Sequence, residues 1–206
     1  MGSGSRSDCL VMRHNSKALS PATSTNLCQY IKPLSSFIQY GQMKFLITDQ
    51  PNEQNMDTFI KELTDHGVKY LVRVCEPNYS TEPIVAQGIE VIDWVYNDGS
   101  PPPTEIINKW IELCKKTFVK NCDPRENPTI AIHCMYGLGR SPLIVAIALM
   151  ESGLGFEEAV LTIRQKRRGA CNERQLNFLK NYQAHGELKY LILQNKLKPE
   201  KFCGIM

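Results

Sequence analysis

The sequence predicts an α/β fold, with a central, mainly parallel sheet flanked by helices on both faces. The order of the predicted elements supports this prediction. Short apolar runs of strand length alternate along the chain with longer apolar or amphipathic runs of helix length. Strands that alternate with helices favour crossover connections, which produce parallel strands covered on both sides.

The first elements follow from apolar patterning between turn residues. Strands are predicted at residues 37–40, 43–48, 68–75 and 89–94, the first two joined by a turn at Gly41-Gln42. A helix is predicted from Met56, with an apolar face that runs to Leu63, and Gly67 ends it. A short helix at 81–87 is expected to end at Gly88.

The second half of the domain continues the alternation. Thr104 is predicted to cap a helix that runs to about Val119, and a buried strand follows at 129–133. Three helices are expected at 142–152, 156–168 and 173–185. Asn172 and Gln175 resemble a capping box for the last of them.

The strand at 129–133 leads directly into a glycine-rich turn before a helix. Ser141 is predicted to cap this helix and Pro142 to occupy its first position, so that backbone N–H groups converge at the positive end of the helix dipole. Such a turn binds anions. The expected phosphate-binding residues are Met135, Tyr136, Gly137, Leu138, Gly139, Arg140 and Ser141.

Cys134 adds a nucleophile to this anion site. A helix N-terminus and a nearby cation stabilise a thiolate, so we expect Cys134 to be ionised at neutral pH. Arg140 can hold two phosphoryl oxygens with its planar guanidinium, and His133 is interpreted as a partly buried residue that orients the loop. The alternative is that Cys134 is an ordinary buried cysteine at the end of a strand and that Arg140 is an unrelated surface arginine. The pattern His-Cys-x2-Gly-x2-Arg-Ser between strand and helix favours a phosphatase-type site.

Such a site also needs a proton donor. The leaving oxygen must be protonated when a thiolate attacks phosphorus, and the resulting phosphocysteine must be hydrolysed by an activated water. Asp98 is the candidate for both steps, because it lies in a loop between a strand and a helix while Asp93 is expected to be held within or beside the strand. Asp98 precedes the cysteine loop, which argues against the small arsenate-reductase-like phosphatases.

Composition limits the other possibilities. The 206 residues are predicted to comprise a disordered extension at 1–36, one domain at 37–185 and a tail at 186–206. A net charge of +3 does not suggest nucleic-acid binding. The eight cysteines show no C-x2-C spacing and no signal peptide is apparent, so we expect reduced cytosolic thiols, no metal site and no cofactor.

Six segments of the sequence match one known family. They are MKFLIT at 43–48, VRVCE at 72–76, DW at 93–94 with DGSPP at 98–102, HC at 133–134 with GLGR at 137–140, IRQKRRGA at 163–170 and CGIM at 203–206. By these segments residues 37–185 resemble the phosphatase of regenerating liver family, or protein tyrosine phosphatase type IVA, a branch of the dual-specificity phosphatases. The resemblance implies the cysteine phosphatase fold and the hydrolysis of phosphomonoesters.

The resemblance also implies roles for individual residues. Cys134 is the nucleophile, Arg140 binds phosphate, Asp98 is the general acid, and Cys75 can form a disulfide with Cys134. From its position at a strand end, Cys75 is equally a buried core thiol. The family usually has alanine where this chain has Ser141, whose hydroxyl can stabilise Cys134 as a leaving group. We therefore predict faster phosphoenzyme breakdown than is typical of the family.

The C-terminal residues are predicted to attach the protein to membranes. Cys203 begins a C-a-a-X box whose terminal Met206 favours farnesylation, which makes farnesyltransferase a partner. One lipid chain with a few lysines gives reversible binding. We expect a cytoplasmic protein attached peripherally to the inner face of the plasma membrane or to endomembranes, and the resemblance allows a membrane-linked homotrimer.

Two functions remain open at this stage. In one, the protein is an enzyme that acts on phosphoproteins or phosphoinositides. In the other, it is mainly a binding module for acidic partners, including cyclin-M-type magnesium transporters, which the resemblance implies. The basic run from Arg164 to Arg168 is then a partner surface rather than an ordinary solvated face, and Arg168 is the residue assigned to the contact.

Overall fold

The computed structural model describes residues 35–119 and 127–193. In these residues five strands form one sheet in the order β1-β2-β5-β3-β4. The pairs β2–β5, β5–β3 and β3–β4 are parallel, and only the edge pair β1–β2 is antiparallel. The predicted α/β class with a mainly parallel sheet is confirmed. The strands are β1 (Ser35–Tyr40), β2 (Met43–Thr48), β3 (Val68–Arg73), β4 (Glu90–Asp93) and β5 (Thr129–His133).

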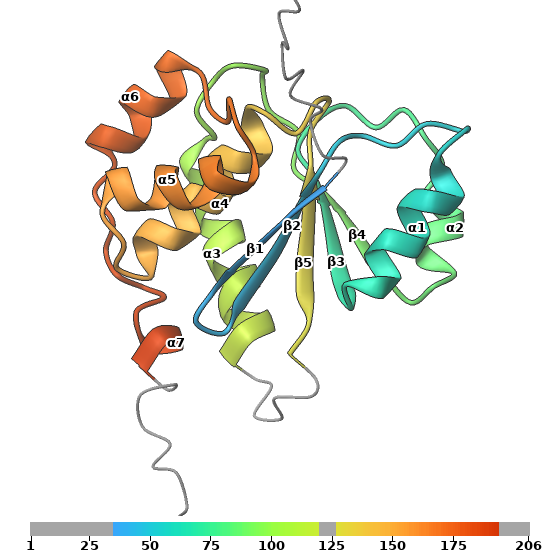
Figure 1. Ribbon diagram of the computed structural model, residues 1–206, viewed down its shortest axis with the longest axis horizontal. Helices are drawn as coiled ribbons and strands as arrows, with labels where there is room; N and C mark the ends of the chain where they lie inside the picture. The colour runs from blue at the N-terminus through green and yellow to red at the C-terminus, as the bar shows by residue number, and fades with distance from the viewer. Residues whose placement is uncertain (1–34, 120–126, 194–206) are drawn as a thin grey trace, which may run out of the picture. The chain divides into compact units, whose positions relative to one another are not determined.

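Helices cover both faces of the sheet, as predicted (Figure 1). One face packs against α3, α4, α5 and α6, and the other against α1 and α2. Each face has its own apolar core, because side chains alternate across the strands and both sides of the sheet are buried. The helices are α1 (Met56–Asp65), α2 (Glu82–Val85), α3 (Thr104–Val119), α4 (Arg140–Glu151), α5 (Phe156–Lys166), α6 (Glu173–Asn181) and α7 (Tyr190–Leu193).

The strands end together at one edge of the sheet. Thr48 of β2 and Arg73 of β3 both pair with His133 of β5, and Arg73 also pairs with Asp93 of β4. The loops that follow these strands therefore begin at the same level. Ligand sites in open parallel sheets lie beyond this carboxyl edge, which is where the predicted site residues Asp98 and Cys134 are placed.

Several boundaries differ from the predicted ones. Strand β1 begins at Ser35, because its pairing continues to Thr48 at the end of β2. Thr104 is the first residue of α3 rather than its cap. Helices α5 and α6 end earlier than expected, at Lys166 and Asn181.

The predicted terminal segments are mostly outside the described residues. This applies to residues 1–34 of the extension and 194–206 of the tail, including the C-a-a-X box that begins at Cys203. Among the described helices, none is both long and apolar enough to cross a membrane.

Candidate active site

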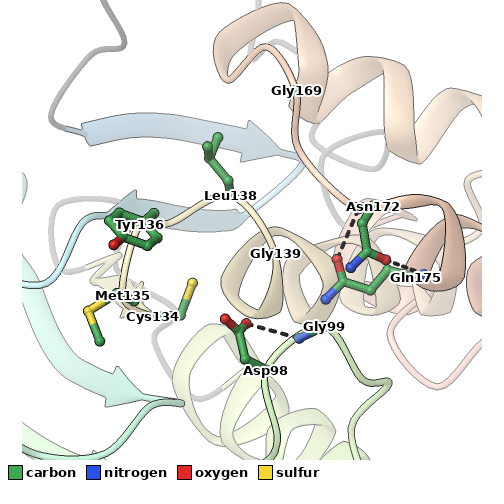
Figure 2. Close-up of a pocket in the computed structure, with 10 residues that line it drawn as sticks. All are labelled: Asp98, Gly99, Cys134, Met135, Tyr136, Leu138, Gly139, Gly169, Asn172 and Gln175. Atoms are coloured by element: carbon green, nitrogen blue, oxygen red, sulfur yellow. Dashed lines mark hydrogen bonds between the residues drawn. The ribbon is translucent and has the colours of Figure 1, made fainter.

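The structure brings Cys134 and Asp98 to the wall of one pocket of about 440 Å³, although 35 residues separate them in the chain. Cys134 follows the central strand β5, and Asp98 lies in the loop between β4 and α3. Figure 2 shows their side chains extending from opposite walls toward the same space. The remaining lining residues are Gly99, Met135, Tyr136, Leu138, Gly139, Gly169, Asn172 and Gln175.

The loop after Cys134 is held by its carbonyl groups. The four carbonyls of residues 135–138 all accept hydrogen bonds from outside the loop. The N–H of Gln50 donates to the first at 3.3 Å, Arg167 donates to the second and third, and the N–H of Cys171 donates to the fourth at 2.7 Å. In a planar trans peptide the following N–H points opposite to the carbonyl, so the N–H groups of residues 136–139 turn away from these outer donors. This arrangement is that of an anion-binding turn.

Arg167 is a central part of this site that sequence reasoning misplaced. The prediction counted it in an exposed basic run, but its side chain is fully buried. Its Nε donates to the carbonyl of Gly137 at 2.5 Å, its Nη1 donates to the hydroxyl of Ser36 at 3.2 Å, and its Nη2 pairs with Asp49. Because Arg167 and Arg168 are adjacent and identical, no sequence pattern indicates which of the two is buried. Arg168 is exposed.

Gly137 allows the loop and Arg167 to approach each other closely. It has a φ of +59°, and a Cβ at this position would lie 2.5 Å from the carbonyl oxygen of Thr48 and would also clash with the Arg167 guanidinium. Only glycine satisfies both requirements without displacing its neighbours.

Arg140 is anchored by backbone carbonyls. Its side chain is 7% exposed, and its Nη1 donates to the carbonyls of Val74 at 3.1 Å and Tyr96 at 3.0 Å. The hydroxyl of Tyr96 in turn donates to the carbonyl of Arg140 at 3.1 Å. The Nε of Arg140 lies 3.1 Å from Oδ1 of Asp98, an ion pair without the alignment of a hydrogen bond. Tyr96 therefore ties the loop that carries Asp98 to the arginine.

The two aspartates near this loop have different surroundings. Asp93 is held by Arg73, whose Nε and Nη2 donate to its two carboxylate oxygens at 2.6 and 2.7 Å, as expected of a structural pair. The side chain of Asp98 is 70% exposed at the pocket, and its Oδ1 accepts a hydrogen bond from the N–H of Gly99 at 2.9 Å. The prediction that Asp93 is held at its strand is confirmed.

Cys75 and His133 lie beneath the loop. His133 is fully buried, and burial lowers its pKa to about 4, so the ring is neutral at pH 7. The Nε2 of His133 lies 2.6 Å from the hydroxyl of Tyr79, and its Nδ1 lies 3.8 Å from Sγ of Cys75. Burial raises the pKa of the Cys75 thiol to about 11, with a smaller contribution from Cys134. A neutral, hydrogen-bonded imidazole fits a positioning role.

The start of α4 differs from the prediction. The helix begins at Arg140 with Gly139 as its N-cap, because the N–H of Leu143 already bonds the carbonyl of Gly139. Ser141 therefore lies inside the first turn and does not cap the helix. Its hydroxyl is fully buried and, among the described residues, has no hydrogen-bond partner.

Gln175 is a pocket residue whose place the sequence did not predict. The expected capping box is confirmed: Asn172 Oδ1 accepts from the N–H of Gln175 at 2.9 Å, and Gln175 Oε1 accepts from the N–H of Asn172 at 3.1 Å. The capping pattern indicated the helix start, but only the packing of α6 over the loop places Gln175 in the pocket wall. Met135 and Tyr136 form the exposed rim, with exposed fractions of 43% and 67%.

Comparisons with known proteins agree with this geometry. Mouse protein tyrosine phosphatase type IVA 2 is 44% identical over 161 residues, which cover 77% of this chain and 93% of the mouse protein. The PRL-1 phosphatase of Drosophila melanogaster is 43% identical over 160 residues, covering 78% and 89% of the two chains. The probable type IVA A phosphatase of Dictyostelium discoideum is 45% identical over 150 residues, covering 73% and 88%.

Solved structures show the same fold. A protein tyrosine phosphatase (putative) from Leishmania major superimposes with a TM-score of 0.64 at 36% identity, over 72% of this chain and 98% of the other. PTPMT1, solved in complex with PI(5)P, has a TM-score of 0.59 at 17% identity, over 79% and 99%, which shows likeness of fold alone. No protein-family model matches the sequence. The relatives and the shared fold show that this chain belongs to the protein tyrosine phosphatase type IVA family of cysteine-dependent phosphatases.

Proposed function

We propose that this protein hydrolyses phosphotyrosine in proteins through a phosphocysteine at Cys134. The observation that carries the proposal is the meeting of Cys134 and Asp98 in one pocket, with Arg140 paired to Asp98 at 3.1 Å. A nucleophile, an acid and a fixed guanidinium are the three groups that phosphoryl transfer to a thiolate requires. The names of the type IVA relatives support tyrosine as the substrate residue.

The first step forms the phosphoenzyme. The Cys134 thiolate attacks phosphorus, the bond from phosphorus to the tyrosine oxygen breaks, and Asp98 donates a proton to the leaving oxygen. Arg140 and the N–H groups of residues 136–139 bind the phosphoryl oxygens. Because Asp98 contacts Arg140, an entering phosphoryl group competes for the guanidinium and leaves the Asp98 carboxyl group for the leaving oxygen.

The second step releases phosphate. A water attacks phosphorus, Asp98 accepts its proton, and the electron pair of the sulfur–phosphorus bond returns to Cys134. The buried hydroxyl of Ser141, one residue beyond Arg140, is suited to donate to this returning thiolate.

Turnover of a small aryl phosphate by reduced protein tests these roles. We expect Cys134→Ser to abolish turnover and Asp98→Asn to lower it by about 10²-fold or more, the usual size of a general-acid contribution. Asp57→Asn, which removes an exposed carboxylate at the start of α1, is the matched control and should retain full activity. Unchanged turnover in Cys134→Ser or Asp98→Asn would refute the assignment of that residue. Parallel assays with phosphopeptides and phosphoinositides identify the substrate class.

A binding function is the second candidate, and one contact favours it. The guanidinium of Arg140 already holds the carboxylate of Asp98, so the site accepts a carboxylate as well as a phosphoryl group. An acidic side chain of a cyclin-M-type transporter module would use the same affinity, with the exposed Arg168 next to Gly169 of the pocket wall as a further contact. Arg168→Glu should then weaken binding in a pull-down with that module, and unaltered binding would remove Arg168 from the interface.

A lipid anchor and a redox pair complete the proposal. A farnesyl group on Cys203 would hold this cytoplasmic protein at membranes. Cys203→Ser should then appear in the soluble fraction on cell fractionation, and membrane association that persists would mean another anchor.

Peroxide that converts Cys134 to a sulfenic acid would let the Cys75 thiol condense with it, releasing water and forming a disulfide. Cys75→Ser should then lose activity that reductant does not restore, and full recovery would exclude this protection.

A further inference from the structure

A second cavity, of about 470 Å³, opens between the residues that begin α1 and those that begin α2. The loops on its two sides follow β2 and β3, which end at the same edge of the sheet as the strand before Cys134. We call this cavity the flanking groove. Its apolar lining residues are Pro51, Met56, Tyr79 and Pro83.

The walls of the flanking groove are bonded to the loop of the nucleophile. On one side the N–H of Gln50 donates to the carbonyl of Met135 at 3.3 Å. On the other side the hydroxyl of Tyr79 lies 2.6 Å from Nε2 of His133. Because Met135 and His133 are the two neighbours of Cys134 in the chain, the groove lies next to the active-site pocket on the side of Met135.

Glu53 gives the flanking groove a negative charge. It is exposed, and among the lining residues that the structure describes it is the only charged one. Arg73 lies over the Tyr79 ring at 4.9 Å, but Asp93 already pairs with it through two hydrogen bonds. The potential in the groove is therefore negative, which favours a cationic group of a ligand.

The loop that carries Glu53 is fixed by its own hydrogen bonds. Oδ1 of Asn52 accepts from the N–H groups of Gln54 and Asn55 at 2.9 and 3.0 Å, and Oδ1 of Asn55 accepts from the N–H of Asn52 at 2.7 Å. These bonds hold the backbone on both sides of Glu53. Little conformational entropy is then lost when a ligand pairs with its carboxylate.

The opposite side of the active-site pocket carries the opposite charge. Figure 2 shows Gly169 and Asn172 on that side, across the pocket from the rim residues. Close to them in the chain, the exposed Arg168 and Arg174 outweigh Glu173. A peptide bound across the site therefore meets negative charge at one end and positive charge at the other, which favours one direction of binding.

We infer that the flanking groove binds a basic residue of the substrate protein, close to its phosphotyrosine in the chain, with the cationic head group paired to Glu53. This inference rests on the proposed function. The methylene stem of the lysine or arginine packs on the apolar walls that Met56 and Tyr79 provide, while its charge stays at the exposed carboxylate. An acidic residue in the same position is repelled by Glu53, so the groove selects between substrates.

The turnover of paired phosphotyrosine peptides tests the inference. Each pair carries arginine or glutamate at one position beside the phosphotyrosine, and the two kcat/KM values are compared on the same enzyme. We expect arginine to be preferred about fivefold on one side of the phosphotyrosine only, the size expected of one partly exposed ion pair. Added salt should reduce the preference, because it screens such a pair.

Glu53→Lys should reverse the preference at the same position, since the lysine attracts glutamate and repels arginine. Glu90→Lys is the matched control, because it makes the same change at an exposed residue where β4 begins, at the edge of the sheet away from the site. It should keep the wild-type preference and the wild-type turnover of a small aryl phosphate.

A photochemical cross-link locates the bound side chain. Cys134→Ser, which is expected to bind a phosphopeptide without turning it over, is irradiated with a peptide that carries benzophenone at the preferred position. Label on Met56 is expected. Label on α6, at Asn177 or Phe178, would place this side chain in the cavity across the site and overturn the inference.

The outcomes separate this inference from the proposed function. An arginine preference that Glu53→Lys reverses supports it. If no position prefers arginine, or if Glu53→Lys changes both kcat/KM values without changing their ratio, the inference is wrong while the phosphatase activity stands. If the wild type turns over no phosphotyrosine peptide, the proposed function fails, and the inference fails with it.

Discussion

Arg167 is the residue whose replacement tests the architecture of the site most directly. Its guanidinium joins three parts of the chain: the loop after Cys134 through the Gly137 carbonyl, the end of β2 through Asp49, and β1 through the hydroxyl of Ser36. Arg167→Met keeps much of the side-chain volume and removes all of these bonds. The loop carbonyls and the Asp49 carboxylate then lose their donors in a region where little water is available.

The expected loss of stability follows from burial. The Arg167 side chain is fully buried, while that of Asp49 is 29% exposed. Removing one partner of a buried ion pair costs about 3–5 kcal/mol. Because solvent reaches the remaining carboxylate in part, we expect the lower end, about 3 kcal/mol. Activity should fall more than stability alone explains, since carbonyls that are no longer anchored allow the loop N–H groups that we propose to bind phosphate to rotate.

Urea unfolding and aryl phosphate turnover measure the two effects, the latter below the unfolding transition. Arg168→Met is the matched control, because it removes the same side chain from the adjacent, exposed position. It should change the free energy of unfolding by less than about 0.5 kcal/mol. If Arg167→Met lost less than about 1 kcal/mol and kept normal turnover, the loop would not depend on this buried arginine.

Three further predictions follow from buried polar groups. Burial lowers the pKa of His133 from 6.5 to about 4, so between these pH values the unfolded chain binds a proton that the folded protein does not. Unfolding experiments should therefore show that about 3 kcal/mol of stability is lost as the pH falls through this range. A His133→Asn variant that lost the same stability over this range would contradict the prediction. Ser141→Ala should leave the phenol burst unchanged and slow phosphoenzyme breakdown about tenfold, and an unchanged breakdown rate would show that the hydroxyl does not assist the leaving thiolate. Glu151 is buried and accepts a hydrogen bond from the Tyr182 hydroxyl at 2.7 Å. Glu151→Gln should therefore lower the free energy of unfolding by about 2 kcal/mol, whereas Glu157→Gln, at an exposed position, should leave it unchanged in the same denaturation assay.

Local patterns were sufficient for much of the fold. Short apolar runs predicted the strands because a mainly parallel sheet is buried on both faces, and glycines at 67 and 88 marked helix ends because the backbone there has positive φ. Element ends were less accurate. The helix that starts at Arg140 was expected two residues later, because Pro142 and Ser141 suit a helix start locally while the bond from Leu143 to Gly139 decides it.

The sequence by itself determined the family and the α/β class, and it predicted the nucleophile, the arginine and the acid of the candidate site. These properties depend on segments that are continuous in the chain, such as the run from His133 to Ser141, whose chemistry can be recognised without knowing what surrounds it. The same reasoning placed Asp98 in a loop after a strand, where parallel sheets bring their ends together.

Only the tertiary structure decided which polar residues complete the site. Arg167 and Arg168 are identical and adjacent, yet one is buried beneath the loop and the other is exposed, because the turn that follows α5 directs only Arg167 toward the end of β2. Gln175 looks like a capping residue until α6 is packed beside Gly139. Burial and hydrogen-bond partners come from contacts between segments far apart in the chain, so no local pattern contains them.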